Sequence, residues 1–284
     1  MRTALALLAG LSMIAAACAR PTAPEGAGEV QVRLGAKAPL QWTLPDGLRE
    51  ISGLALDAQQ RLFAIDDEQA VVYEIDYEDG GIRRRFAVGN PVLRGDFEGL
   101  AAVGETLYAL TSDGVLLRFA PVEDGATTVG ARRDTGLGKR CEFEGLAYDR
   151  QGDALLLACK RVLERGRKRE VRLYRWSLAG DDLTSSSIDE DILAAAVGTE
   201  DFQPSAVAID RRDGSLWLLA ARQQAVARLA VDASGRLTLL EAQPLPFASL
   251  HRQSEGLALA EDGLVMIADE GGKQRGRLAR YGRR

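Results

Sequence analysis

Three glutamates recur at one position of a repeated sequence element, and they are the residues best suited to bind a metal. The three copies read Phe97-Glu98-Gly99-Leu100, Phe143-Glu144-Gly145-Leu146 and Ser254-Glu255-Gly256-Leu257. Two further copies place Ser52 and Ser205 at the same position. If the copies surround one axis, the three carboxylates meet there and repel one another unless a cation neutralises them. A hard cation such as Ca²⁺ suits this set, with serine hydroxyls, carbonyls and water completing its shell.

A second group of acidic residues follows the second apolar strand of two copies. Asp66-Asp67-Glu68 lies in the first copy and Asp269-Glu270 in the last. These copies would be neighbours in a closed ring, so we include Asp66, Asp67, Glu68 and Glu270 among the candidate metal ligands. The alternative is that they are solvated turn residues. The repeated glutamates could likewise cap their own sheets or pair with a base, for which Lys160 is the candidate.

His251 is the only histidine in the sequence. A site that needs two imidazoles is therefore excluded, and with it most catalytic zinc arrangements. A calcium-dependent lactonase, esterase or phosphoesterase would use the cation to polarise an oxygen and would need a general base. His251, four residues before Glu255, is the candidate base, and its alternative role is an ordinary surface residue. No Gly-x-Ser-x-Gly nucleophile motif is present.

The elements that must position these residues are short strands. Counted from the Ser/Glu position, the copies begin at residues 52, 98, 144, 205 and 255, so their spacings are 46, 46, 61 and 50. Each copy continues with a turn, a short apolar strand, a polar turn and a third strand. A fourth strand is predicted near 82–88, 127–132, 183–188 and 237–242. The best helical stretch is 189–197.

The fifth copy has no room for a fourth strand, because the sequence ends at Arg284. One strand, Leu40–Leu44, is left over before the first copy, and it would complete the fifth sheet. A repeat of this length with four strands per unit is typical of a β-propeller. The sequence therefore predicts an all-β fold over 39–284, a five-bladed β-propeller with four-stranded blades whose ring is closed by an N-terminal strand.

The N-terminus has the features of a targeting segment. Ala4 to Ala17 is an apolar run of fourteen residues, too short to span a bilayer and typical of a signal peptide, here 1–17. The run ends Ala15-Ala16-Ala17-Cys18, which resembles a bacterial lipobox with Cys18 lipidated, although leucine is usual where Ala15 stands. Residues 18–38 would then form a flexible tether. The alternative is a plain Ala-x-Ala cleavage with Cys18 incidental.

Either form of cleavage places the protein outside the cytoplasm. We expect a lipoprotein of the bacterial cell envelope that faces the periplasm. The thiols of Cys141 and Cys159 then meet an oxidising compartment and are a candidate disulfide. A hairpin turning near Gln151-Gly152 would set Cys159 opposite Glu144, so a loop excursion would be needed for the bridge. Alternatively, Cys159 is a small core residue.

The distribution of charge limits the partners. The formal net charge is −5 and the basic residues are scattered, which argues against nucleic-acid binding. One basic insertion, Lys160 to Arg169, could contact anionic lipid headgroups, its alternative being a solvated hairpin. We expect two kinds of partner, namely the membrane, through the lipid anchor, and an envelope ligand or protein. We expect the protein itself to be a monomer.

The motifs together resemble one family. Glu50-Ile51-Ser52-Gly53-Leu54, 63–68, 96–100 and 254–257 are similar to the SdiA-regulated (YjiK-like) family, which is related to NHL-repeat propellers. The resemblance extends from about Leu40 to Tyr281. It implies a calcium-binding five-bladed propeller, in envelope proteins without an established reaction, with Glu98, Glu144, Glu255 and the acidic turn 66–68 at the family's motif positions. The fourth copy, 203–206, departs from the motif and supplies no motif glutamate on that side of the ring.

Overall fold

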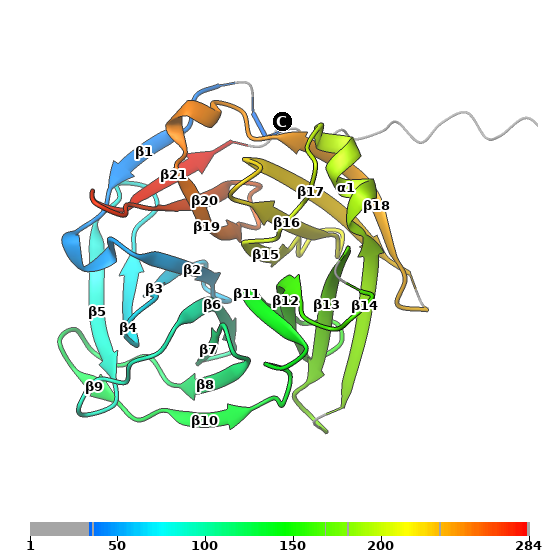
Figure 1. Cartoon of the computed structure of the whole chain (residues 1–284). Coiled ribbons are helices and arrows are strands. Elements are labelled where there is room, and N and C mark those ends of the chain that lie inside the picture. The colour runs from blue at the N-terminus through cyan, green and yellow to red at the C-terminus, as the bar shows by residue number, and fades with distance from the viewer. Residues whose placement is uncertain (1–33, 36, 168, 181, 233, 283–284) are drawn as a thin grey trace, which may run out of the picture. The chain divides into compact units, whose positions relative to one another are not determined.

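Five sheets stand around a central axis and form a five-bladed β-propeller (Figure 1). This computed structural model describes residues 34–35, 37–167, 169–180, 182–232 and 234–282. The predicted signal peptide, Cys18 and the tether before residue 34 lie outside the described residues. Among the described helices, none is long and apolar enough to cross a membrane. The all-β five-bladed fold predicted from the repeat is confirmed.

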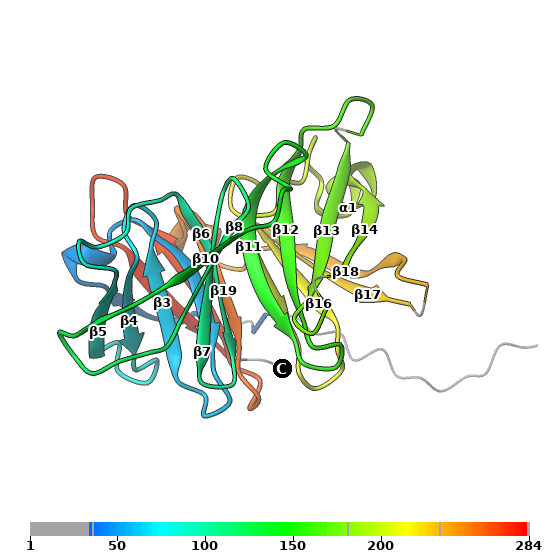
Figure 2. The same ribbon diagram turned by 90° about the horizontal axis from the view of Figure 1, so that it is seen from below.

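Each blade begins with a strand at the axis, and its next strands follow outwards (Figure 1). In the side view most strands run from one face of the ring toward the other (Figure 2). Blade 1 contains β2 (Ile51–Leu56), β3 (Leu62–Asp66), β4 (Val71–Ile75) and β5 (Ile82–Val88). Blade 2 contains β6 (Phe97–Val103), β7 (Thr106–Thr111), β8 (Val115–Phe119) and β10 (Ala131–Asp134). Blade 3 contains β11 (Cys141–Asp149), β12 (Ala154–Val162), β13 (Glu170–Ser177) and β14 (Leu183–Asp189). Blade 4 contains β15 (Ala206–Ile209), β16 (Leu216–Ala220), β17 (Ala225–Val231) and β18 (Leu237–Pro244).

Blade 5 joins the two ends of the propeller sequence. It contains β19 (Gln253–Leu259), β20 (Val265–Glu270) and β21 (Arg277–Tyr281), and its outer strand is β1 (Leu40–Thr43). β1 pairs antiparallel with β21, with Leu40 opposite Arg280. The predicted closure by an N-terminal strand is therefore confirmed. The packed part begins earlier than the predicted boundary at residue 39, because Leu34 is buried and the Gly35 N–H donates to the Gly282 carbonyl at 3.1 Å.

The outer strand of blade 2 differs from its prediction. The segment predicted as one strand over 127–132 divides into β9 (Thr127–Thr128) and β10. β9 leaves its own blade and pairs parallel with β5 of blade 1, so that sheet has a fifth strand. The predicted helical stretch forms α1 (Glu190–Val197), with Asp189 as its N-cap and Gly198 at its C-cap. Two short 3₁₀ turns, η1 (Asp46–Leu48) and η2 (Ala248–Leu250), complete the elements of the described chain.

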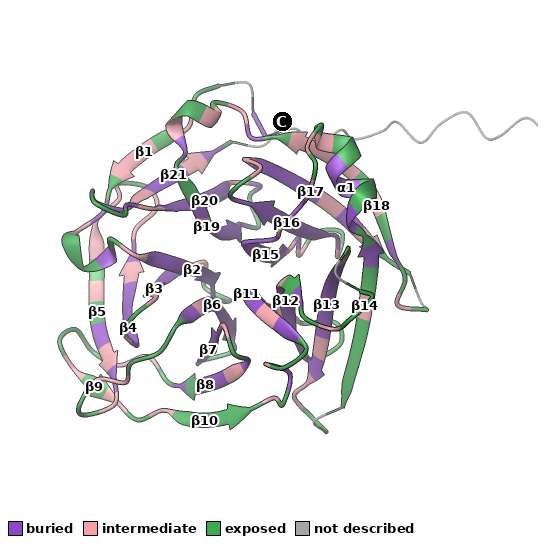
Figure 3. Cartoon of the chain, viewed as in Figure 1, coloured by how far each residue is buried: buried purple, intermediate pink, exposed green. Residues whose placement is uncertain are grey.

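The hydrophobic core is divided into five clusters, one between each pair of neighbouring blades. The strands near the axis are almost wholly buried, whereas the outer strands carry many exposed residues (Figure 3). Glycines allow the innermost strands to approach closely. A Cβ at Gly99 would lie 2.7 Å from the Leu146 backbone nitrogen, and one at Gly53 would lie 2.8 Å from that of Leu100. Any side chain at these positions would force the blades apart.

A disulfide joins Cys141 and Cys159 across the β11–β12 hairpin, with their Cα atoms 5.7 Å apart. The register differs by one residue from the predicted one, because Cys159 lies opposite Phe143 and not opposite Glu144. β-Bulges on both sides of Phe143 supply the excursion that the bridge requires. Both cysteines are buried.

Candidate functional site

The repeated Ser/Glu position is the site of a β-bulge at the axis. In blade 2, Phe97 pairs with Thr111 and Gly99 pairs with Leu110, so Glu98 is the extra residue between them. Ser52 and Glu255 are the extra residues of equivalent bulges in blades 1 and 5, and β11 has a bulge across Glu144 and Gly145. A bulge bends its strand and redirects the side chain. The same device therefore presents all three glutamates at one end of the channel.

The channel is narrow at this end. Glu98, Glu255 and Ser52 line a cavity of only about 10 Å³, whose other walls are glycine and aliphatic residues of the inner strands. This is about the space that one water molecule needs. Beyond it lies a cavity of about 60 Å³ lined mainly by leucine and alanine. The carboxylates thus stand at the mouth of a channel whose wall beyond them is mainly aliphatic.

The charged form of Glu98 is strongly disfavoured at the channel mouth. Burial, followed by repulsion from Glu144, Asp96 and Glu255, raises the pKa of Glu98 to about 9. Burial also raises the pKa of Glu144, but only to about 7, because Lys160 donates a hydrogen bond to it. The alternative of pairing with Lys160 therefore describes Glu144, and it does not describe Glu98.

Glu270 brings a second group of carboxylates to the same mouth. Burial, and hydrogen-bonding proximity to the carboxyl groups of Glu50 and Glu255, raise the pKa of Glu270 to about 9. The Gly271 N–H donates to the Arg49 carbonyl at 2.7 Å, which holds the end of β20 beside Glu50. Gln253 donates an amide hydrogen to Glu255 at 2.6 Å and another to Glu270. Two carboxyl groups held by one amide, with Glu50 raising the pKa of Glu270 further, must share protons or a cation.

The acidic turn of blade 1 lies next to Glu98. The Phe97 N–H donates to the Asp67 carbonyl at 2.7 Å, so the turn and the glutamate strand are joined through the backbone. Burial, with repulsion from Asp66, Glu50 and Glu68, raises the pKa of Asp67 to about 7. Its Oδ1 is buried and has no hydrogen-bond partner among the described residues. Such an orphaned carboxylate oxygen is the kind of atom that a cation would satisfy.

The two serines hold blades together. Ser52 Oγ donates to the Phe97 carbonyl of blade 2, and Ser205 Oγ donates to the Ser254 carbonyl of blade 5 at 2.7 Å. In each case the acceptor is the residue before the glutamate of the next blade. Because both serines are buried and bonded in this way, we assign them to contacts between blades. These hydrogen bonds account for both serines without a bound metal, so their expected part in a metal shell stays a prediction.

The structure corrects the interpretation of His251 as an ordinary surface residue, whereas its role as a catalytic base stays a prediction. The imidazole is fully buried in blade 5, with Nδ1 2.9 Å from Asp269 Oδ2 and Nε2 2.5 Å from Tyr281 Oη. Ser254 Oγ also donates to Asp269 at 2.6 Å, and Tyr281 Oη donates to the Pro246 carbonyl at 3.0 Å. Both ring nitrogens are thus occupied within the blade. Asp269 also points away from its neighbour Glu270 and belongs to this network.

The described part of the basic insertion is largely neutralised. Besides Lys160, the residues Arg161, Arg167 and Arg169 each pair with a carboxylate, namely Glu142, Glu170 and Asp191. This pairing favours the solvated hairpin over a lipid-binding patch, because few free cations remain for headgroups.

Sequence reasoning did not select Glu50 or Gln253 as site residues. Both stand two residues before the Ser/Glu position, and this position is acidic or an amide in every copy, occupied by Glu50, Asp96, Glu142, Gln203 and Gln253. That second recurrence was the available indication.

No three Asp, Glu, His or Cys side chains of the described chain stand together as a ready metal-binding group. The donor chemistry fits a hard cation, but the carboxylates would have to turn toward one point.

Comparison with known proteins identifies the family. The family model described as SdiA-regulated matches residues 34–272. The chain belongs to the SdiA-regulated family. The family match confirms the resemblance drawn from the Ser/Glu-Gly-Leu motifs. A comparison with curated protein sequences finds no significant match.

Solved structures similar to this SdiA-regulated protein share its fold. Glutaminyl cyclase from Myxococcus xanthus is 14% identical, with a TM-score of 0.55 over 87% of this chain and 95% of that one. The PQQ-bound aldose sugar dehydrogenase from Streptomyces coelicolor is 14% identical, with a TM-score of 0.51 over 89% of this chain and 100% of that one. At this identity the likeness concerns the fold alone.

Proposed function

We propose that this protein binds Ca²⁺ at the acidic mouth of its propeller channel and serves as a binding module in the bacterial cell envelope. The observation that carries the proposal is that the Gln253 amide donates to both Glu255 and Glu270, so that these two carboxylates lie side by side at the mouth. Carboxylates held together in this way ionise at neutral pH only when a positive charge compensates them. Lys160 compensates Glu144, which leaves the others for a bound cation.

The ligands come from three blades. Glu98 would approach from blade 2, Glu255 and Glu270 from blade 5, and Glu50 and Asp67 from blade 1. All are oxygen donors, which is what Ca²⁺ prefers, and the number available allows for six or more oxygens once carbonyls and water are counted. When bound, the cation supplies the positive charge that lets buried carboxylates ionise. Through the bound cation, these five carboxylates would fix blades 1, 2 and 5 relative to one another at the mouth of the channel.

The proposal does not extend to catalysis. The alternative of a calcium-dependent hydrolase requires a base near the metal, and the candidate base, His251, is enclosed by Asp269 and Tyr281 in blade 5. The envelope location rests on the apolar segment before Cys18 and on the lipobox-like sequence, which together indicate a lipid anchor facing the periplasm.

Equilibrium dialysis of the chelator-treated mature protein against Ca²⁺ tests the proposal. We expect at least one ion per chain at pH 7.5 and its loss at pH 5, where protons compete for the carboxylates. The double variant Glu255→Gln/Glu270→Gln should not bind, while Glu105→Gln, an exposed glutamate on the β6–β7 turn, should bind normally. Protein that takes up no Ca²⁺ at pH 7.5, or a double variant that binds as well as wild type, would refute it.

A further inference from the structure

A cavity of about 750 Å³ lies between blades 3 and 4, far from the acidic mouth. It is reached from the end of β11 at Tyr148 and Asp149, whereas Glu144 lies toward the beginning of that strand. Its aliphatic lining comes from both blades, namely Leu156, Leu173, Ile209, Leu216, Val231 and Leu237. Its volume falls within the range of about 300–1,000 Å³ typical of small-molecule sites.

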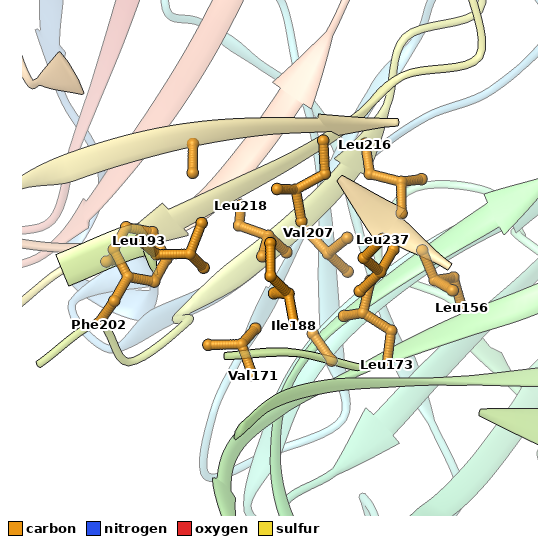
Figure 4. Close-up of a cluster of buried hydrophobic side chains, with 14 of the residues drawn as sticks. Leu156, Val171, Leu173, Ile188, Leu193, Phe202, Val207, Leu216, Leu218 and Leu237 are labelled. Carbon is orange, nitrogen blue, oxygen red and sulfur yellow. The ribbon is translucent and has the colours of Figure 1, made fainter. Parts of the chain in front are cut away.

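The cavity exists because the space between these blades is only partly filled. The long connection between blades 3 and 4 places Leu193 of α1 and Phe202 in one end of the hydrophobic cluster between the sheets. Figure 4 shows these two side chains at one end and Leu156, Leu216 and Leu237 at the other. The latter three belong both to the cluster and to the cavity wall. The apolar wall is therefore continuous with the core and preformed.

The rim of the cavity carries four arginines and three carboxylates. Arg175 pairs with Asp149, Arg212 with Asp210 and Arg211 with Glu261; these six residues and Arg150 all line the opening. Arg150 is exposed and has no carboxylate partner among the described residues. The rim is thus positive by one charge, on a protein whose net charge is −5.

Gly152 leaves the space at this rim that the Arg175 guanidinium occupies. A Cβ at Gly152 would lie 1.2 Å from Arg175 Nη2, so any other residue there would displace the guanidinium. Asp149 Oδ2 accepts from Arg175 Nε at 3.1 Å and from Nη2 at 2.5 Å. This contact leaves Nη1 of Arg175 without a hydrogen-bond acceptor in the described chain, and Arg175 and Arg150 line the same cavity. Two guanidinium groups can therefore meet an anion at one end of an apolar cavity.

We propose that this cavity binds a small amphipathic carboxylate, with its aliphatic body against the leucines and its head against Arg150 and Arg175. The charge of the rim selects an anion over a neutral or cationic ligand of the same shape. The two blades enclose the body between sheets, which suits a compact small molecule better than a polypeptide. This inference is independent of the calcium site.

Three eight-carbon probes test the head-group preference by titration calorimetry of the mature protein. Octanoate should bind roughly tenfold more tightly than octanol, the difference expected for a charge-assisted hydrogen bond. Octyltrimethylammonium should bind more weakly than either. Equal affinities for octanoate and octanol, or the lack of any octanoate binding, would overturn the proposal.

Two substitutions locate the binding. Val231 is 46% exposed at the rim, so Val231→Trp should fold and block the opening, with octanoate affinity falling roughly tenfold or more, the loss expected when most of the apolar contact is excluded. Val129→Trp is the matched control, because Val129 is 88% exposed between β9 and β10, outside the cavity lining. Arg150→Gln should remove most of the preference for octanoate over octanol. Unchanged octanoate binding by Val231→Trp of wild-type melting temperature would place the ligand elsewhere and overturn the assignment.

Discussion

Glu144 forms an ion pair with Lys160, whereas Glu98, at the equivalent position of the adjacent blade, has no such partner among the described residues. Both glutamates lie in β-bulges at the channel mouth. The difference appears in their ionisation, since the pKa of Glu144 is raised to about 7 and that of Glu98 to about 9. One copy of the repeat thus carries its own counter-charge, and the adjacent copy depends on a proton or a cation.

The first prediction concerns the pH dependence of the metal-free protein. An unfolded glutamate titrates near pH 4.5, whereas Glu98 and Glu270 titrate near pH 9 when folded. Between these values the folded state binds more protons, so the free energy of unfolding falls as pH rises. With chelator present, the melting temperature should be lower at pH 8.5 than at pH 5.5. The slope should be shallower in Glu98→Gln. A melting temperature that rises over this range in chelator would contradict the ionisation described here.

His251 is predicted to stabilise the folded protein. His251→Ala leaves Asp269 without its imidazole partner and opens a cavity in blade 5, which should cost about 2–4 kcal/mol. Urea unfolding measures this loss. Arg252→Ala, at the exposed neighbouring position, serves as control and should change stability little. A His251→Ala protein as stable as the control would show that the buried network contributes nothing.

The disulfide should be present in the mature protein and should contribute through the unfolded state. The bridge closes a loop with a sequence separation of 18 residues, for which the expected stabilisation is roughly 3 kcal/mol. Thiol titration of the denatured, unreduced protein should find no free thiol from Cys141 or Cys159. The double variant Cys141→Ser/Cys159→Ser should unfold at lower urea. Two free thiols from these positions would show that the bridge does not form in the envelope.

The lipid anchor remains a prediction, because Cys18 lies outside the described residues. Expressed with its full N-terminus, the protein should be found in the membrane fraction, and Cys18→Ala should move it to the soluble fraction. Mass spectrometry of the mature N-terminus provides the check. A wild-type protein that is soluble and begins at residue 19 or later would refute lipidation.

The ring of blades could be predicted from sequence because it depends on spacing. The recurrence at 52, 98, 144, 205 and 255 and the unpaired strand at Leu40 together require five sheets and a closed ring. The strand over 127–132 was placed wrongly because its pairing with β5 depends on a neighbouring blade. Local residue preference does not contain that information.

The candidate site was predicted in part. The position of Glu98, Glu144 and Glu255 at the axis followed from the repeat, but the bulges did not, since a bulge is defined by the partner strand. His251 was misjudged because its partners Asp269 and Tyr281 lie 18 and 30 residues away in sequence. Glu50 was missed because it lies just before its strand, and its effect on the pKa of Glu270 depends on a strand more than 200 residues away in sequence.

The most direct test of calcium binding is the melting temperature of chelated protein and of Glu98→Gln, each measured at pH 8 with and without Ca²⁺. Calcium should raise the wild-type melting temperature progressively with concentration, since a ligand that binds only the folded state stabilises it. Glu98→Gln should melt higher than wild type in chelator, because the amide is neutral as it stands, whereas the Glu98 carboxyl group must take up a proton when the chain folds at pH 8. It should also gain much less from Ca²⁺. Glu105→Gln should behave as wild type. Identical wild-type melting with and without Ca²⁺ would contradict the proposed site.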